Sequence, residues 1–186
     1  MAEPRRAAKI SDQRSNVSGQ HTSWEPENDI VRHLVLVAIL KNNPIPTAYR
    51  LNYVANFYVG PLIKWMEQRY EMTRPEWIVL FCLNQQTGLN AQQISDVTGR
   101  PKTSISTAVK QLQKKKLIAR YVDIKDGRRQ VLNATDSGQK MYRSILRNFI
   151  SREADMLACL DKNERRLLVS LLDKMIENSA SWAKSY

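Results

Sequence analysis

Two short helical patterns separated by one tight turn constrain the fold of this chain most. The first pattern is capped by Asn90, contains Ile94 and ends at Gly99, which can supply a left-handed stop. Pro101 then opens a second pattern that is expected to run to about Lys116. Helices joined by so short a turn are typical of a helix-turn-helix. The sequence therefore predicts this unit in the middle of the chain.

A β-hairpin signal follows the second helix directly. Ile118–Ile124 and Arg129–Ala134 resemble strands, and Lys125-Asp126-Gly127-Arg128 lies between them. An Asp-Gly pair between two such runs strongly favours a tight hairpin turn. A helix-turn-helix followed by a hairpin is the pattern of a winged helix. The expected fold class is mainly α with a small β-hairpin wing, a winged helix-turn-helix lobe joined to a helical lobe.

Further helical patterns flank this central unit. They are Asn28–Asn42, Thr47–Tyr70 with an expected bend at Gly60-Pro61, a helix opened by the capping box Thr73-Arg74-Pro75-Glu76 and closed at Thr87-Gly88, a helix from Thr135-Asp136 to about Leu160, and a last helix opened by the capping box Asp161-Lys162-Asn163-Glu164. Residues 1–27 are polar without apolar periodicity, which is typical of a disordered arm.

The positive charge of the chain is concentrated around the predicted helix-turn-helix and wing. The whole chain has 29 Lys and Arg against 18 Asp and Glu, a net charge of +11. Residues 100–130 alone carry ten Lys or Arg and two Asp. Such a window can be an ordinary solvated face. It indicates a nucleic-acid footprint if its charges lie on elements that can enter a groove.

A helical projection of the second helix separates an apolar stripe from a polar face. At 100° per residue, Ile105, Ala108, Val109 and Leu112 fall on one side, and hydroxyl and ammonium side chains fall opposite. These groups suit phosphates and base edges. Within or just before this helix the expected DNA contacts are Arg100, Lys102, Thr103, Ser104, Ser106, Thr107 and Lys110; the hairpin adds Arg128, directed at a minor groove, and Arg129. The alternative is an ordinary exposed face.

These motifs resemble the MarR family. The resemblance rests on Ile94–Gly99, Ser106–Leu112, Leu117–Arg120, the acidic residue two positions before an arginine at Asp126 and Arg128, and the wing-to-helix junction Leu132–Gly138. It covers about residues 48–180. It implies a homodimeric winged-helix transcriptional regulator on a pseudo-palindromic operator, with the dimer built from the terminal helices, here roughly 28–66 and 138–182. The arm and the helix 28–42 exceed the usual family length.

The expected organisation has four parts. Residues 1–27 form a disordered arm, 28–72 the N-terminal dimerisation helices, 73–136 the winged helix-turn-helix DNA-binding lobe, and 137–186 the C-terminal dimerisation helices. The final helix carries more apolar surface than a small core can cover, which favours an oligomer interface at Leu168, Leu171, Leu172 and Met175. Burial of this stripe within one subunit is the alternative.

The resemblance also implies a small aromatic or phenolic effector, or an acyl-CoA thioester, bound between the dimer helices and the DNA-binding lobe. The candidate effector residues are aromatic side chains on two consecutive helices, Tyr53, Phe57, Trp65, Trp77 and Phe81. An apolar pocket with few polar groups suits such a ligand. For each of these residues, ordinary core packing is the competing interpretation.

Other function classes find little support in the sequence. Two distant histidines indicate no metal site, no catalytic constellation is present, and no cofactor is expected, so an enzyme is not predicted. Cys82 and Cys159 stand among apolar neighbours and are interpreted as buried small hydrophobes. The longest apolar run has seven residues, short of the ~20 that span a bilayer, and no signal peptide is evident, so the expected location is the cytoplasm.

The sequence therefore predicts a sequence-specific, double-stranded-DNA-binding transcriptional regulator, a repressor released by its effector, with no membrane partner. Two alternatives remain open. One is an architectural protein that binds any duplex through phosphates, and the other is a regulator that senses oxidants through cysteine.

Overall fold

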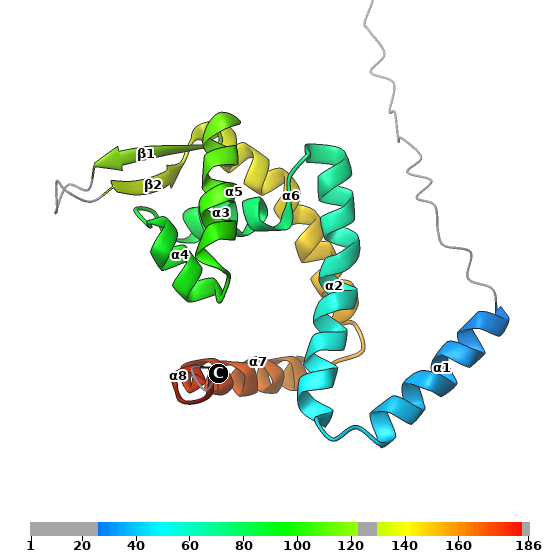
Figure 1. Ribbon diagram of the computed structural model, residues 1–186. Coiled ribbons are helices and arrows are strands. Elements are labelled where there is room, and N and C mark those ends of the chain that lie inside the picture. The colour runs from blue at the N-terminus through cyan, green and yellow to red at the C-terminus, as the bar shows by residue number, and fades with distance from the viewer. Residues whose placement is uncertain (1–25, 123–129, 184–186) are drawn as a thin grey trace, which may run out of the picture. The chain divides into compact units, whose positions relative to one another are not determined.

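The computed structural model describes residues 26–122 and 130–183, so nearly all of the expected disordered arm lies outside the described residues. The chain divides into two compact units, Met1–Arg50 and Leu51–Tyr186, and the boundary lies within one long helix. The elements, labelled in Figure 1, are α1 (Pro26–Lys41), α2 (Pro46–Tyr70), α3 (Arg74–Gln85), α4 (Ala91–Thr98), α5 (Lys102–Lys114), β1 (Ile118–Val122), β2 (Gln130–Ala134), α6 (Asp136–Met156), α7 (Lys162–Glu177) and α8 (Ser179–Trp182).

The predicted fold class is confirmed. The described residues are mostly helical and contain one antiparallel pair of strands, in which Ile118 lies opposite Ala134 and Tyr121 opposite Val131. The Asp-Gly turn that should join these strands lies outside the described residues. The root of the pair is tied to the turn before α4, because Leu132 N donates to Leu89 O at 2.8 Å.

The helices begin close to their predicted starts, and α3 and α6 end three or four residues earlier than expected. The expected stop of α3 at Gly88 is wrong by three residues, because the helix ends at Gln85. Gly88 has a φ of +75° and lies in the following turn, where its N–H donates to Asn133 Oδ1 at 2.7 Å. Helix α6 ends at Met156 rather than near Leu160, because residues 157–160 form a tighter turn with a bond from Leu160 N to Leu157 O.

The core of the second unit is formed by α2, α3, α4, α5, α6 and the strand pair. Its fully buried members include Met66, Leu80, Ile94, Ile105 and Ile145. An aromatic stack extends the core, since the Trp77 ring lies 4.7 Å from Phe149 and 5.6 Å from Tyr142, centroid to centroid. Burial of these side chains fixes α3 and α6 beside each other and provides the support for α5.

Gly138 joins the strand pair to α6 through a close backbone approach. A Cβ built on this residue would lie 2.0 Å from the carbonyl oxygen of Leu117. The same carbonyl accepts from Thr135 N at 3.0 Å and from Thr135 Oγ1 at 3.1 Å. Thr135 also caps α6, with Oγ1 accepting from Gly138 N. The start of α6 is therefore locked to the start of β1, and only glycine fits at this position.

Helices α1 and α7 leave large apolar side chains exposed. In α1, Ile30 and Leu34 are each more than 60% exposed. In α7 no residue is buried, and Leu171 is 53% exposed. Among the residues that the structure describes, no helix is both long enough and apolar enough to cross a membrane.

A gap in the hydrogen-bond ladder of α2 is filled by a side chain from α6. Pro61 lies inside α2 and has no N–H, so the carbonyl of Phe57 lacks its usual helical donor. Arg152 Nη2 donates to this carbonyl at 2.6 Å, and Arg152 Nε donates to the carbonyl of Tyr58 at 2.8 Å. Arg152 thus satisfies the orphaned backbone group and fastens α6 to α2.

We expect Arg152→Met to lower the free energy of unfolding by about 1–3 kcal/mol, because a carbonyl loses a charged donor. The cost should shrink in a Pro61→Ala background, since an alanine at that position supplies the N–H that Phe57 lacks. Urea denaturation followed by circular dichroism measures both values. Arg147→Met, at an exposed position of α6, is the control. Equal costs of Arg152→Met in the two backgrounds would contradict this account of the gap.

Candidate nucleic-acid interface

Side-chain hydrogen bonds fix both the start of α4 and the turn between α4 and α5. Asn90 and Gln93 form a reciprocal capping box at the start of α4, with both bonds at 2.9 Å. Gly99 closes α4 with a φ of +62°, a value that suits glycine. Ser95 Oγ then donates to the carbonyl of Arg100 at 2.6 Å. Gly99 and the bond from Ser95 hold the turn from which α5 begins.

Helix α5 has the two faces that its sequence predicts. Ile105, Ala108, Val109 and Leu112 are each at most 3% exposed. The residues that point away from this stripe are exposed, namely Lys102, Thr103, Thr107, Lys110 and Lys114. Ser104, Ser106 and Arg100 are half-buried at the edges of the exposed face. The helix therefore presents hydroxyl and ammonium groups to solvent while its apolar side holds it in the core.

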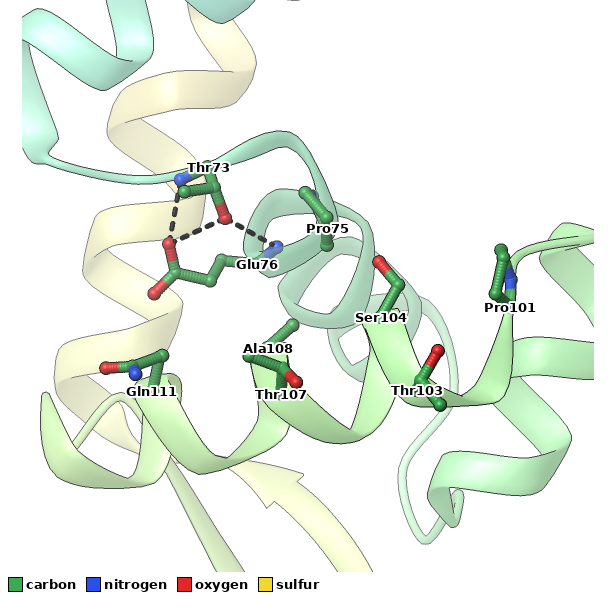
Figure 2. A pocket seen from close by; sticks show the side chains of 9 residues that line it. All are labelled: Thr73, Pro75, Glu76, Pro101, Thr103, Ser104, Thr107, Ala108 and Gln111. Atoms are coloured by element: carbon green, nitrogen blue, oxygen red, sulfur yellow. Dashed lines mark hydrogen bonds between the residues drawn. The ribbon is translucent and has the colours of Figure 1, made fainter.

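A cavity of about 480 Å³ lies along one flank of α5. Thr73, Pro75 and Glu76 at the start of α3 line one side, and the side chains from Pro101 and α5 line the other, namely Thr103, Ser104, Thr107, Ala108 and Gln111 (Figure 2). Thr73 and Glu76 form the predicted capping box, drawn as dashed lines in the same figure. Three of the expected DNA contacts, Thr103, Ser104 and Thr107, thus line this cavity, which is open to a ligand or to the sugar-phosphate backbone of DNA.

Arg74 is a candidate contact that the sequence analysis did not select. Burial lowers the pKa of its guanidinium, and the positive charge of Arg100 lowers it further. The two cations repel each other, and neither forms an ion pair within the described part of the chain. In the sequence, Arg74 is part of the capping box Thr73-Arg74-Pro75-Glu76, and its position next to Thr73 is the only feature that could have identified it as a DNA contact. Arginines without acidic partners suit phosphate oxygens.

The expected wing contacts cannot be placed. Arg128 and Arg129 lie outside the described residues. Within the strand pair, Arg120 Nη1 on β1 donates to Gln130 Oε1 on β2 at 2.8 Å. An arginine is therefore held across the two strands, on the chain segment that leads toward those two residues.

The five aromatic effector candidates do not form one site. Tyr53 and Phe57 line a second cavity of about 350 Å³ with Val54, Tyr58, Arg152, Asp155 and Met156. Trp77 is instead buried in the aromatic core, and Phe81 packs beside it with ring centroids 6.0 Å apart. Trp65 makes an edge contact with Tyr70 at 5.4 Å. The structure thus separates three of the candidates from the cavity lined by the other two.

The Tyr58 hydroxyl contributes a fixed polar group beside this second cavity. Burial and then the negative charge of Glu153 raise the pKa of Tyr58, while Arg152 lowers it. The hydroxyl therefore keeps its proton and donates to the carbonyl of Phe149 at 3.2 Å. The cavity combines aromatic walls with a cationic side chain and an acidic one, Asp155.

The two cysteines differ from the predicted pair of buried hydrophobes. Cys82 is half-buried, and burial raises the pKa of its thiol. The expectation for Cys159 is wrong, because this side chain is exposed in the turn after α6, where Leu160 is half-buried and Ala158 is exposed. Among the described residues, no three His, Cys, Asp or Glu side chains come together to hold a metal ion.

Comparisons with known proteins agree with this architecture. Residues 70–129 match the model of the MarR family. The chain is 26% identical over 109 residues to the uncharacterized HTH-type transcriptional regulator YwaE of Bacillus subtilis (strain 168). That match spans 59% of this chain and 64% of the relative, slightly less than two thirds of its length.

Solved structures have the same fold. A MarR/EmrR family transcriptional regulator from Acinetobacter sp. ADP1 superposes with a TM-score of 0.65 at 27% identity, over 73% of this chain and 95% of that one. The S. aureus MepR–DNA complex gives 0.63 at 26% identity, over 74% and 99%. The family match therefore covers residues 70–129, which span the helix-turn-helix, and the chain has the fold of the MarR-family winged helix-turn-helix regulators.

Proposed function

We propose that this chain is a sequence-specific, double-stranded-DNA-binding transcriptional regulator that inserts α5 into the major groove. The observation that carries the proposal is the division of α5 into a buried apolar stripe and an exposed face with Thr103, Thr107 and Lys110. Hydroxyls can bond to base edges and phosphates, and ammonium groups neutralise phosphates. MepR, a similar structure, is solved as a complex with DNA, which supports the same partner here.

Other basic groups extend this interface on both sides of α5. Lys102 and Arg100 stand at its N-terminal end, where the helix dipole favours a phosphate, and Arg74 adds a cation. Arg128 and Arg129 would reach the minor groove from the wing. In this assignment residues 73–136 form the DNA-binding lobe. Because its partner is chromosomal DNA, we place the protein in the cytoplasm.

We propose a homodimer that binds a pseudo-palindromic operator. The supporting observation is the apolar surface of α7, where Leu168, Leu171 and Met175 are 36–53% exposed and Leu172 is half-buried. A single chain therefore leaves this stripe uncovered, which favours an interface between copies. A two-fold dimer would place its two recognition helices about 34 Å apart, one turn of DNA. Residues 28–72 and 137–186 are assigned to this dimerisation lobe.

We further propose that the protein is a repressor released by a small aromatic acid or its acyl-CoA thioester. The support is the cavity of about 350 Å³ with aromatic walls at Tyr53 and Phe57 and a guanidinium at Arg152. An aromatic ring can pack between such walls while its carboxylate faces the arginine. Since Arg152 links α2 to α6, a ligand there would change the balance between DNA-competent and incompetent dimers.

The architectural alternative makes a different prediction about competition. A protein that contacts only phosphates would be displaced by unrelated duplex as readily as by its best site. The redox alternative rests on the exposed Cys159, since burial keeps the Cys82 thiol protonated. Exposure of one thiol is the whole of its support.

We expect Lys110→Gln to weaken binding to every duplex and to flatten its salt dependence. Loss of one phosphate contact reduces the slope of log K against log salt by about 0.9 per recognition helix. Fluorescence anisotropy at several KCl concentrations measures the slope, using a duplex selected by the wild-type chain from a random-sequence pool. Lys64→Gln, an exposed lysine on α2, is the matched control. An unchanged slope for Lys110→Gln would remove this residue from the interface.

We expect the double substitution Leu171→Glu with Leu172→Glu to give monomers, because it places charges in an apolar interface. Sedimentation velocity at the concentrations where the wild-type chain is dimeric checks this. Ser170→Glu, which adds a charge at an exposed neighbouring position of the same helix, should remain dimeric. A persistent dimer in the double variant would place the interface elsewhere.

We expect an aromatic acid that occupies the second cavity to raise the melting temperature of the wild-type chain and to release the selected duplex. Both effects should be lost in Phe57→Ala, which removes a cavity wall. Phe81→Ala is a matched control, since Phe81 is similarly exposed, 40% against 49%, and lies off the cavity. Thermal shift screening of aromatic acids and their CoA thioesters, followed by anisotropy, makes the test. An equal response of the two variants would move the ligand to another site.

A further inference from the structure

Glu76 is a buried carboxylate within the winged-helix lobe, with only 2% of the residue exposed. Its Oε2 atom accepts from Thr73 N at 2.7 Å and from Thr73 Oγ1 at 2.9 Å. Its Oε1 atom accepts from Lys115 Nζ at 2.8 Å, which forms an ion pair between helix α3 and the end of α5. Both carboxylate oxygens therefore accept hydrogen bonds, one from Thr73 at the start of α3 and the other from Lys115 at the end of α5.

Capping alone does not explain a charge at this position. The capping box needs an acceptor for Thr73 N, and a glutamine completes such a box as well as a glutamate does. A buried carboxylate also has a large desolvation cost, and a buried ion pair is a weak source of stability. What the carboxylate adds over an amide is the bond to the Lys115 ammonium. The charge of Glu76 is thus explained by its partner at the end of α5.

Lys115 lies beside two residues that have a left-handed backbone conformation. Lys115 is the C-terminal cap of α5, and the next residue, Lys116, has a φ of +58°. The ammonium of Lys115 also donates to the carbonyl of Glu71, whose φ is +49°. Left-handed conformations are costly for residues other than glycine and persist where the surroundings hold them. Lys115 therefore bonds to the first of these positions, before α3, and directly precedes the second, after α5.

The flank of α5 nearest to this ion pair is hollow. The cavity of about 480 Å³ separates the start of α3 from Thr107 and Gln111, so side-chain packing does not fill the space between the two helices there. Figure 2 shows Glu76 on the α3 side of the cavity and Gln111 on the α5 side. The ion pair connects the two helices beside this hollow.

We propose that Glu76 and Lys115 are positioning residues for DNA recognition. Their ion pair sets the orientation of α5, and thereby aligns the hydroxyls of Thr103 and Thr107 with base edges, while Lys115 makes no phosphate contact of its own. This inference rests on the proposed function, because it assumes that α5 reads DNA. Misorientation of a rigid reading helix costs base contacts first, since these need closer geometry than contacts to phosphates do.

The test compares Glu76→Gln, Lys115→Met and the double variant with wild type. Glu76→Gln keeps the capping box and removes the charge, and the double variant leaves no unpaired buried charge, so it folds even if Lys115→Met does not. Lys64→Met and Glu67→Gln, exposed on α2, are the matched controls. Anisotropy gives the affinity for the selected duplex, the affinity for a scrambled duplex of the same composition, and the salt slope of each.

We expect the ratio of the two affinities to fall about tenfold in Glu76→Gln and in the double variant, with the salt slope unchanged. Loss of folded protein, which circular dichroism melts detect, would lower both affinities equally and leave their ratio intact. A wild-type ratio in the folded double variant therefore overturns the inference, as does a flatter slope in Lys115→Met alone. If the wild-type chain selects no sequence from the pool, the proposed function itself fails.

Discussion

The packing of the apolar stripe of α5 is the interaction on which the rest of the lobe depends. Ile105, Ala108, Val109 and Leu112 insert into the core against α3, and this burial leaves the opposite side of the helix with no packing role. The free side can therefore carry hydroxyl and ammonium groups without loss of stability. Because an α-helix has a period of 3.6 residues, the side chains that pack in the core and the side chains proposed to contact DNA lie on opposite faces of α5.

Helix α3 supplies the counterpart to that packing. Its apolar side supports α5, and Trp77 stacks on Tyr142 and Phe149 of α6. Its first turn supplies the capping box and the buried carboxylate of Glu76. A side chain on α6 in turn completes the hydrogen bonding of α2 at Phe57. Helix α5 is thus connected to α2 through α3 and α6 by packing and by a few charged hydrogen bonds.

Features that depend on a local sequence pattern are predicted correctly, whereas features that depend on contacts between residues far apart in the chain are not. The stripe of α5 and the stop at Gly99 are predictable because periodicity and a left-handed glycine are local signals. The end of α3 differs from its expected position because Asn133, 45 residues away, takes the N–H of Gly88. The pairing of Lys115 with Glu76, 39 residues apart, has no sequence pattern. The exposure of Cys159 is not predictable because apolar neighbours in sequence do not establish burial.

The fastening of β2 to the turn before α4 has a consequence for how such a regulator can move. Leu132 N bonds to Leu89 O, and Asn133 Oδ1 accepts from Gly88 N, so the strand root and the entry to the helix-turn-helix share adjacent residues. In the proposed complex, a duplex would therefore meet one stiff body rather than two independent arms. In the proposed dimer, adjustment to an operator of different half-site spacing would occur at the joint between subunits, while each half keeps its own contacts unaltered.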